Sequence, residues 1–199
     1  MGYSRYYPYP EIDNPWDEKC FAYLKPIIKN KLVQTYHPRS SRCSYCRRYF
    51  GLNGDNINID IEHILPKNKY KEYTFFLPNL TLACKRCNMT IKGNRIDFLK
   101  IKKGDPKYKT ELDFDKNNYK FLHPKLEDIS EYLNYKRDET DEYCVLFYNK
   151  TDKGLGDDRV DYMIDFFKLK ELEIDSREVF QGNIKNLEIQ RKLNIPDEY

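Results

Sequence analysis

The 199-residue sequence predicts an α+β protein, with a small strand–strand–helix unit between an N-terminal helical segment and a mainly helical C-terminal region. Two C-x-x-C pairs, Cys43/Cys46 and Cys84/Cys87, bracket a stretch in which isoleucines alternate with polar residues. Such alternation is typical of a half-buried strand. On both sides of this stretch, apolar residues recur at three- and four-residue spacing, which indicates helices.

Residues 1–41 are expected to form an extended arm rich in tyrosine and proline, followed by a helix. Asn14 is of a residue type that caps helices, and Pro15 suits the first turn. Pro26 lies within the helical pattern and predicts a kink or a break. The apolar residues at helical spacing are Phe21, Leu24, Ile28 and Leu32.

Residues 42–103 carry the strand–strand–helix unit. Segments 47–50 and 58–62 are predicted to be two strands, joined by a loop that contains glycine and asparagine. After them, 77–83 is expected to be a loop or a short strand, and 85–92 a short helix. A metal ion between the strands and the helix would complete the unit.

Residues 104–199 begin with a polar segment, 104–120, whose proline, glycine and asparagine residues indicate a connector. The remainder is expected to be mainly helical, and its acidic character suits it to docking another protein rather than to binding phosphate. The predicted elements are helices over 126–135, 158–169 and 176–193 and a strand over 143–148.

The charged residues are divided unequally between these parts. Residues 42–103 hold 13 Lys and Arg against 5 Asp and Glu, whereas residues 104–199 hold 16 against 23. A basic segment that coincides with the cysteine pairs suggests a polyanionic partner, although solvated surface charge is the usual explanation of a modest excess.

The first residues contain no apolar run, so neither a signal peptide nor a membrane span is expected. The six cysteines, arranged as two C-x-x-C pairs and two single residues, do not resemble the disulfide framework of a secreted protein. The cytoplasm is therefore the expected location.

The two C-x-x-C pairs supply four thiolates, which is the complement of a closed tetrahedral zinc site. Four reduced thiols in a core are the plain alternative, and a redox C-x-x-C would require only one pair. The 37 residues between Cys46 and Cys84 predict a functional element inserted between the pairs. We expect structural zinc on Cys43, Cys46, Cys84 and Cys87, and we expect Cys20 and Cys144 to be core residues.

An acid–histidine pair, Glu62-His63, lies within that insert, together with Asn79. Hydrolysis of a phosphodiester needs an activated water and neutralisation of charge at the phosphate. Histidine is the side chain best matched to general-base catalysis near neutral pH. The other two histidines, His37 and His123, each precede a proline and are expected to be structural or surface residues.

The motif Ile61-Glu62-His63-Ile64-Leu65-Pro66-Lys67, with Asn79-Leu80 and Cys84-x-x-Cys87-Asn88, resembles the HNH endonucleases, whose core is a ββα-metal fold. More loosely, with Phe121-x-His123-Pro124, the whole chain is similar to the HNH subunit of Septu-type anti-phage defence systems. The second resemblance implies a partner subunit that is an ATPase, which is an argument by analogy.

The resemblance implies a role for each residue of the motif. His63 would take the proton of the attacking water, and Asn79 would orient its imidazole by the side-chain amide or the backbone carbonyl. Glu62 and Asn88 would bind a catalytic Mg²⁺ or Mn²⁺, with Asp60 as a further candidate ligand.

The motif departs from the common pattern after the second cysteine pair. Asn88 stands where many members have histidine, and Asn94 competes with it for the last metal role. One extra residue separates Asn88 from Lys92, compared with the common C-N-x-x-K form. The basic residues expected to contact nucleic acid are Lys67, Lys85, Arg86, Lys92 and Arg95.

The sequence thus predicts an HNH endonuclease that cuts DNA, with RNA still open as a substrate. The alternative is a catalytically inactive zinc-knuckle module that binds nucleic acid or a protein. Such a module needs the cysteines and the basic residues but has no use for an acid–histidine pair.

Overall fold

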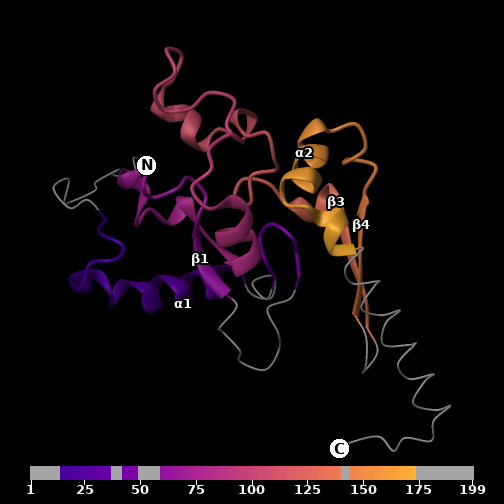
Figure 1. Cartoon of the computed structure of the whole chain (residues 1–199), viewed down its shortest axis with the longest axis horizontal. Helices are drawn as coiled ribbons and strands as arrows, with labels where there is room; N and C mark the ends of the chain where they lie inside the picture. The colour runs from indigo at the N-terminus through magenta and orange to yellow at the C-terminus, as the bar shows by residue number, and fades with distance from the viewer. Residues whose placement is uncertain (1–13, 37–41, 49–58, 140–143, 174–199) are drawn as a thin grey trace, which may run out of the picture. The chain divides into compact units, whose positions relative to one another are not determined.

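The computed structural model describes residues 14–36, 42–48, 59–139 and 144–173. Contacts divide the chain into two units, Met1–Asp128 (unit 1) and Ile129–Tyr199 (unit 2) (Figure 1). Both units mix helices with a two-stranded sheet, so the predicted α+β class is confirmed. The finer division at residues 41 and 103 stays a prediction.

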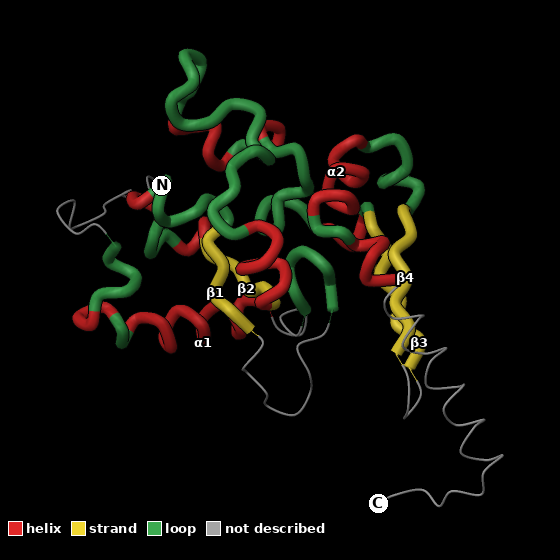
Figure 2. The backbone as a smooth tube through the Cα atoms, in the orientation of Figure 1, coloured by secondary structure: helices red, strands yellow, loops and turns green. Residues whose placement is uncertain are grey.

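Unit 1 is built on an antiparallel sheet of β1 (Ile59–His63) and β2 (Leu80–Cys84) (Figure 2). The predicted strand over 58–62 is confirmed from residue 59, and the short strand expected within 77–83 is confirmed as β2. The strand expected over 47–50 lies only partly within the described residues. Residues 47 and 48 form no strand, and 49–58 lie outside the described residues. Every residue of β2 is buried.

The N-terminal helix begins later than predicted. A turn at residues 14–17 leads to the short turn η1 (Lys19–Phe21), and only then does α1 (Leu24–Tyr36) begin. Pro26 therefore lies in the first turn of α1, where its missing N–H leaves no helical bond unmade, and no kink is required. Ile28 and Leu32 are buried, and α1 contacts β2.

The predicted helix over 85–92 is confirmed as η6 (Arg86–Lys92), a widened turn. The N–H of Gly93 donates to the carbonyl of Asn88 over 2.7 Å, so the turn closes across five residues rather than four. Gly93 has φ +47°, a conformation that glycine adopts readily. The wide turn accommodates the extra residue between Asn88 and Lys92.

The segment predicted as a connector belongs to the core of unit 1. Tyr119 is fully buried, and its ring lies 5.9 Å from that of Phe98. The connector prediction was wrong because its polar residues are satisfied internally: the Tyr73 hydroxyl donates to the buried Asp113 carboxylate. The remaining short turns are η4 (Lys71–Tyr73), η5 (Leu77–Asn79), η7 (Thr110–Phe114) and η8 (Lys116–Asn118).

Unit 2 contains a hairpin, of which the second strand was expected and the first was not. Its described elements are η9 (Ile129–Glu131), β3 (Leu133–Glu139), β4 (Cys144–Lys150) and α2 (Asp158–Phe166). The predicted strand over 143–148 and helix from 158 are confirmed. The predicted helix over 126–135 is wrong, because its last residues pair with β4. The predicted helix over 176–193 lies outside the described residues.

No helix in the described ranges combines the length and the apolar character that a membrane crossing requires. Cys20 is exposed, so its predicted place in the core is wrong. The side chain of Cys144 lies outside the described residues.

His123 is a buried structural residue of unit 1. Its Nδ1 atom accepts the backbone N–H groups of Lys125 and Leu126 over 3.2 and 3.3 Å, and its ring lies edge-on to Tyr119. Burial, assisted by the charge of Lys125, lowers the pKa of His123 to about 3. The imidazole is therefore neutral in the folded protein at pH 7.

This lowered pKa makes stability depend on pH. Below the unfolded-state pKa of about 6.5 the unfolded chain binds a proton that folded His123 excludes, so stability is lost as pH falls from 6.5 towards 3. Asparagine offers the same acceptor without titrating, so His123→Asn should remove about 1.4 kcal/mol of that loss per pH unit. Urea unfolding between pH 6.5 and 5, with metal content monitored, measures this slope. Equal slopes for the two proteins would contradict the assignment.

Candidate active site and metal centre

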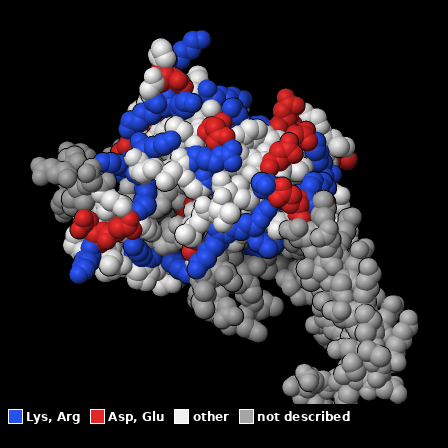
Figure 3. Space-filling model, in the orientation of Figure 1, with Lys and Arg blue, Asp and Glu red and all other residues white. Residues whose placement is uncertain are grey.

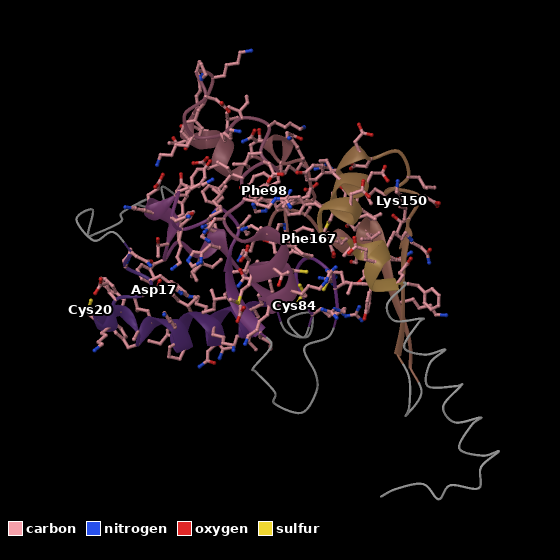
Figure 4. All side chains as sticks on the ribbon, viewed as in Figure 1. Asp17, Cys20, Cys84, Phe98, Lys150 and Phe167 are labelled. Carbon is pink, nitrogen blue, oxygen red and sulfur yellow. The ribbon has the colours of Figure 1, made fainter. Side chains whose placement is uncertain are left out.

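The four cysteines of the two C-x-x-C pairs converge within unit 1. Their sulfur atoms all lie within 4.8 Å of one another, and the four residues are buried. Figure 4 labels one of them, Cys84. Four Zn–S bonds of about 2.3 Å in a tetrahedron place sulfur atoms roughly 3.8 Å apart. The Sγ atoms of Cys46 and Cys84 are separated by 3.8 Å. The group therefore fits a closed tetrahedral metal site.

The thiols of this group influence one another strongly. Burial raises the pKa of Cys43, whereas hydrogen bonding, first of all with Cys43, lowers the pKa of Cys84. Arg48 adds a positive charge, since its Nη2 atom lies 3.8 Å from the sulfur of Cys84. Four thiolates in this volume would repel one another, so a bound dication would stabilise the fully ionised set.

Glu62 and His63 end strand β1, and both are buried. The Glu62 carboxylate is 2% exposed and accepts from the ammonium of Lys92 over 2.7 Å and from the hydroxyl of Tyr45 over 3.2 Å. Burial raises the pKa of Glu62, and Lys92 opposes that effect. The expected metal ligand thus lies in a closed ion pair rather than in an open position.

His63 is held in one tautomer. Its Nε2 atom lies 2.9 Å from the backbone carbonyl of Thr74, and because a carbonyl only accepts, Nε2 carries the proton. The lone pair is then on Nδ1. Burial lowers the pKa of His63 to about 4, so the ring is neutral at pH 7. Trp16 packs edge-on against it, with 4.6 Å between ring centroids.

Asn79 hydrogen-bonds the backbone that follows His63. Its side-chain oxygen accepts the N–H of Leu65 over 2.8 Å, and its side-chain nitrogen donates to the carbonyl of Leu65 over 3.0 Å. Its own carbonyl accepts the N–H of Ile64 over 2.9 Å. The printed hydrogen bond of the imidazole goes to the Thr74 carbonyl, and the expectation that Asn79 orients the ring stays a prediction.

Asp60 and Asn88 form the more open pair of oxygen-bearing side chains. The Asn88 side-chain nitrogen lies 3.2 Å from a carboxylate oxygen of Asp60, and both residues are half-buried. Asp60 shares a strand face with Glu62, two residues away. Asn94, the competing candidate, is exposed after η6.

The expected phosphate-binding residues lie in different environments, and acidic groups lie among the basic ones on the face drawn in Figure 3. Lys67 bonds to Asn14 and Asp17 of the N-terminal turn, over 3.0 and 2.8 Å. Lys85 is exposed and Arg86 half-buried, while Arg95 is exposed and pairs with Asp97. Lys92 is 1% exposed, so the expectation that it contacts phosphate does not match its place in this structure.

Three contacts of the site were missed by the sequence reasoning: Thr74, Tyr45 and Trp16. Thr74 acts through its backbone carbonyl, which every residue type has, so its sequence carries no signal. Tyr45 lies inside the first C-x-x-C pair, and Trp16 is the single tryptophan of the chain. Their positions in the sequence could have marked them as candidates, but only the fold shows that Tyr45 contacts Glu62 and that Trp16 contacts His63.

Residues 43–95 match the family model of the HNH endonucleases, a segment that is less than half of the chain. The chain matches no curated protein and no solved structure. The matched segment begins at the first cysteine of the cluster and contains Glu62, His63, Asn79 and Asn88. Residues 43–95 of this protein are thus similar to the HNH endonucleases.

Proposed function

We propose that the protein is a metal-dependent endonuclease that hydrolyses phosphodiester bonds of nucleic acid, with His63 as the general base. The observation that carries this proposal is the tautomer of His63. The bond from Nε2 to the Thr74 carbonyl leaves a basic lone pair on Nδ1, inside a segment that matches the HNH endonucleases.

In the proposed reaction, Nδ1 of His63 takes a proton from a water that attacks the phosphorus in line with the leaving oxygen. A pKa of about 4 keeps the ring unprotonated across the neutral range, although it makes His63 a weak base. Asn79 contributes by fixing the backbone after His63, so that the imidazole keeps its place during the proton transfer.

The residues that fit a divalent cation best are Asp60 and Asn88, whose side chains are adjacent and partly exposed. Oxygen ligands with room for water suit Mg²⁺ or Mn²⁺. When bound, such a cation would neutralise charge on the phosphate and the leaving oxygen. Lys92 and Tyr45 both bond to the Oε1 atom of Glu62, so Oε2 is the oxygen that Glu62 would offer to such a cation.

Zinc is the metal we propose for Cys43, Cys46, Cys84 and Cys87, in a structural role. Four sulfur ligands leave no coordination position for a substrate. The separation of 3.8 Å between two of the sulfurs supports this choice.

DNA is the substrate we favour, because residues 42–103 are basic and Lys85 and Arg86 lie beside the cysteine cluster. The looser resemblance to Septu-type systems further suggests an ATPase partner in cytoplasmic anti-phage defence. Co-purification with the product of the neighbouring gene tests that partner, and a monomer indifferent to it would count against the defence role.

Loss of one zinc ligand should destabilise the whole site. Cys87→Ser leaves three sulfurs for the metal and should release zinc and lower the melting temperature, because structural zinc contributes on the order of 10 kcal/mol in small domains. Zinc analysis and calorimetry measure both effects. Cys20→Ser is the matched control, since Cys20 is exposed. Full zinc content in Cys87→Ser would refute the assignment.

His63→Ala should abolish cleavage while leaving zinc content unchanged. Removal of a general base costs roughly 10²- to 10⁴-fold in rate. The assay incubates plasmid, single-stranded DNA and RNA with Mg²⁺ or Mn²⁺, and His123→Asn is the control histidine. Wild-type cleavage by His63→Ala would sink the proposal. Metal-independent binding without any cleavage by the unaltered protein would favour the inactive zinc-knuckle module.

A further inference from the structure

We propose that Lys92 is a positioning residue of this site, which fixes Glu62 and the backbone of His63 instead of contacting phosphate. The catalytic consequence of this inference rests on the proposed nuclease function. Its structural basis rests on contacts within unit 1 alone.

Three groups surround the Lys92 ammonium. Nζ lies 2.7 Å from a carboxylate oxygen of Glu62 and 2.8 Å from the carbonyl oxygen of His63, and 5.7 Å from the ring centroid of Phe98. The side chain is 1% exposed. An ammonium with two short acceptors and an aromatic face, shut away from solvent, has no free direction in which to meet a phosphate.

The two buried charges depend on each other. Glu62 is 2% exposed, and Tyr45 supplies its second hydrogen bond. Removing one member of such a pair leaves the other charge buried without compensation, whereas removing both is far better tolerated. The two charges therefore act as a unit: removing Lys92 alone should destabilise the protein more than removing both, which is not expected of a surface lysine.

The position of Lys92 in the chain explains how this pair can affect the geometry of the site. Lys92 is the last residue of η6, the same turn that carries Cys87 and Asn88. Through Lys92, η6 is bonded to the last two residues of β1. The bond thus sets the distance between the general base on β1 and Asn88, the proposed metal ligand on η6.

Two different roles for Lys92 predict opposite kinetics. A phosphate contact contributes to binding, so its loss raises KM and reduces the salt dependence of affinity by about one phosphate. A positioning residue leaves binding intact, but a displacement of about 1 Å in the base can cost on the order of 10²-fold in rate.

The test compares Lys92→Met, which keeps the chain length and removes the charge, with Lys100→Met, an exposed lysine of the same unit. Full-length, zinc-loaded proteins are assayed for kcat, KM and salt-dependent oligonucleotide binding with Ca²⁺ in place of Mg²⁺. We expect Lys92→Met to lower kcat about 10²-fold per folded molecule, with KM and the salt slope unchanged. Lys100→Met should behave as the unaltered protein.

A second arm does not require activity. Hydrogen exchange at the amides of Ile64 and Leu65, which bond to Asn79, should accelerate in Lys92→Met and not in Lys100→Met. The double variant Glu62→Gln/Lys92→Met should regain much of the melting temperature lost by Lys92→Met. If the unaltered protein cuts nothing, the proposed function fails. Amide exchange and the melting temperatures then still test whether Lys92 positions Glu62 and the His63 backbone.

Two outcomes would overturn the inference. A raised KM with a reduced salt slope at unchanged kcat would make Lys92 a phosphate contact. Unchanged kcat per folded molecule, together with unchanged exchange at residues 64 and 65, would mean that the Glu62–Lys92 pair only packs in the core and positions nothing.

Discussion

The convergence of four cysteine sulfurs within 4.8 Å is the constraint on which the rest of unit 1 depends. It ties the turn that begins at Cys43 to the end of β2 and to the start of η6. Strand β2 in turn fixes β1, in a register that places His63 opposite Leu80. With β1 and η6 both anchored, the Lys92 ammonium meets Glu62 and the His63 carbonyl.

The charged groups of the site differ in their exposure: some are buried in an ion pair, and others are partly exposed to solvent. The Glu62–Lys92 pair is desolvated and satisfies itself, so it serves geometry more than chemistry. Asp60 and Asn88 remain partly exposed, as a cation that keeps several waters requires. Lys67 is intermediate, because its partner Asp17 is exposed and such surface pairs contribute only about 0–1 kcal/mol. A phosphate could therefore replace Asp17 at little cost, whereas it could not replace Glu62.

The sequence was sufficient for those parts of the site that depend on side-chain chemistry at fixed spacing. The cysteine cluster, the strand that ends at His63 and the short helix after Cys84 all follow from residue types. The sequence was insufficient where the role of a residue depends on a backbone group or on burial. The carbonyl of Thr74 has no residue signature, and nothing in the composition distinguishes the buried Lys92 from its exposed neighbours. Strand β3 of unit 2 was missed because strand pairing overrode the local helical pattern of 126–135.

The central claim is that His63 is neutral, with its proton on Nε2 and its lone pair on Nδ1. Nitrogen-15 NMR of the histidine rings in the zinc-loaded protein tests it most directly, because the two tautomers and the imidazolium have different ring shifts. The account predicts the Nε2–H tautomer at pH 7 and titration only near pH 4. A proton on Nδ1, or a charged ring at pH 7, would contradict it.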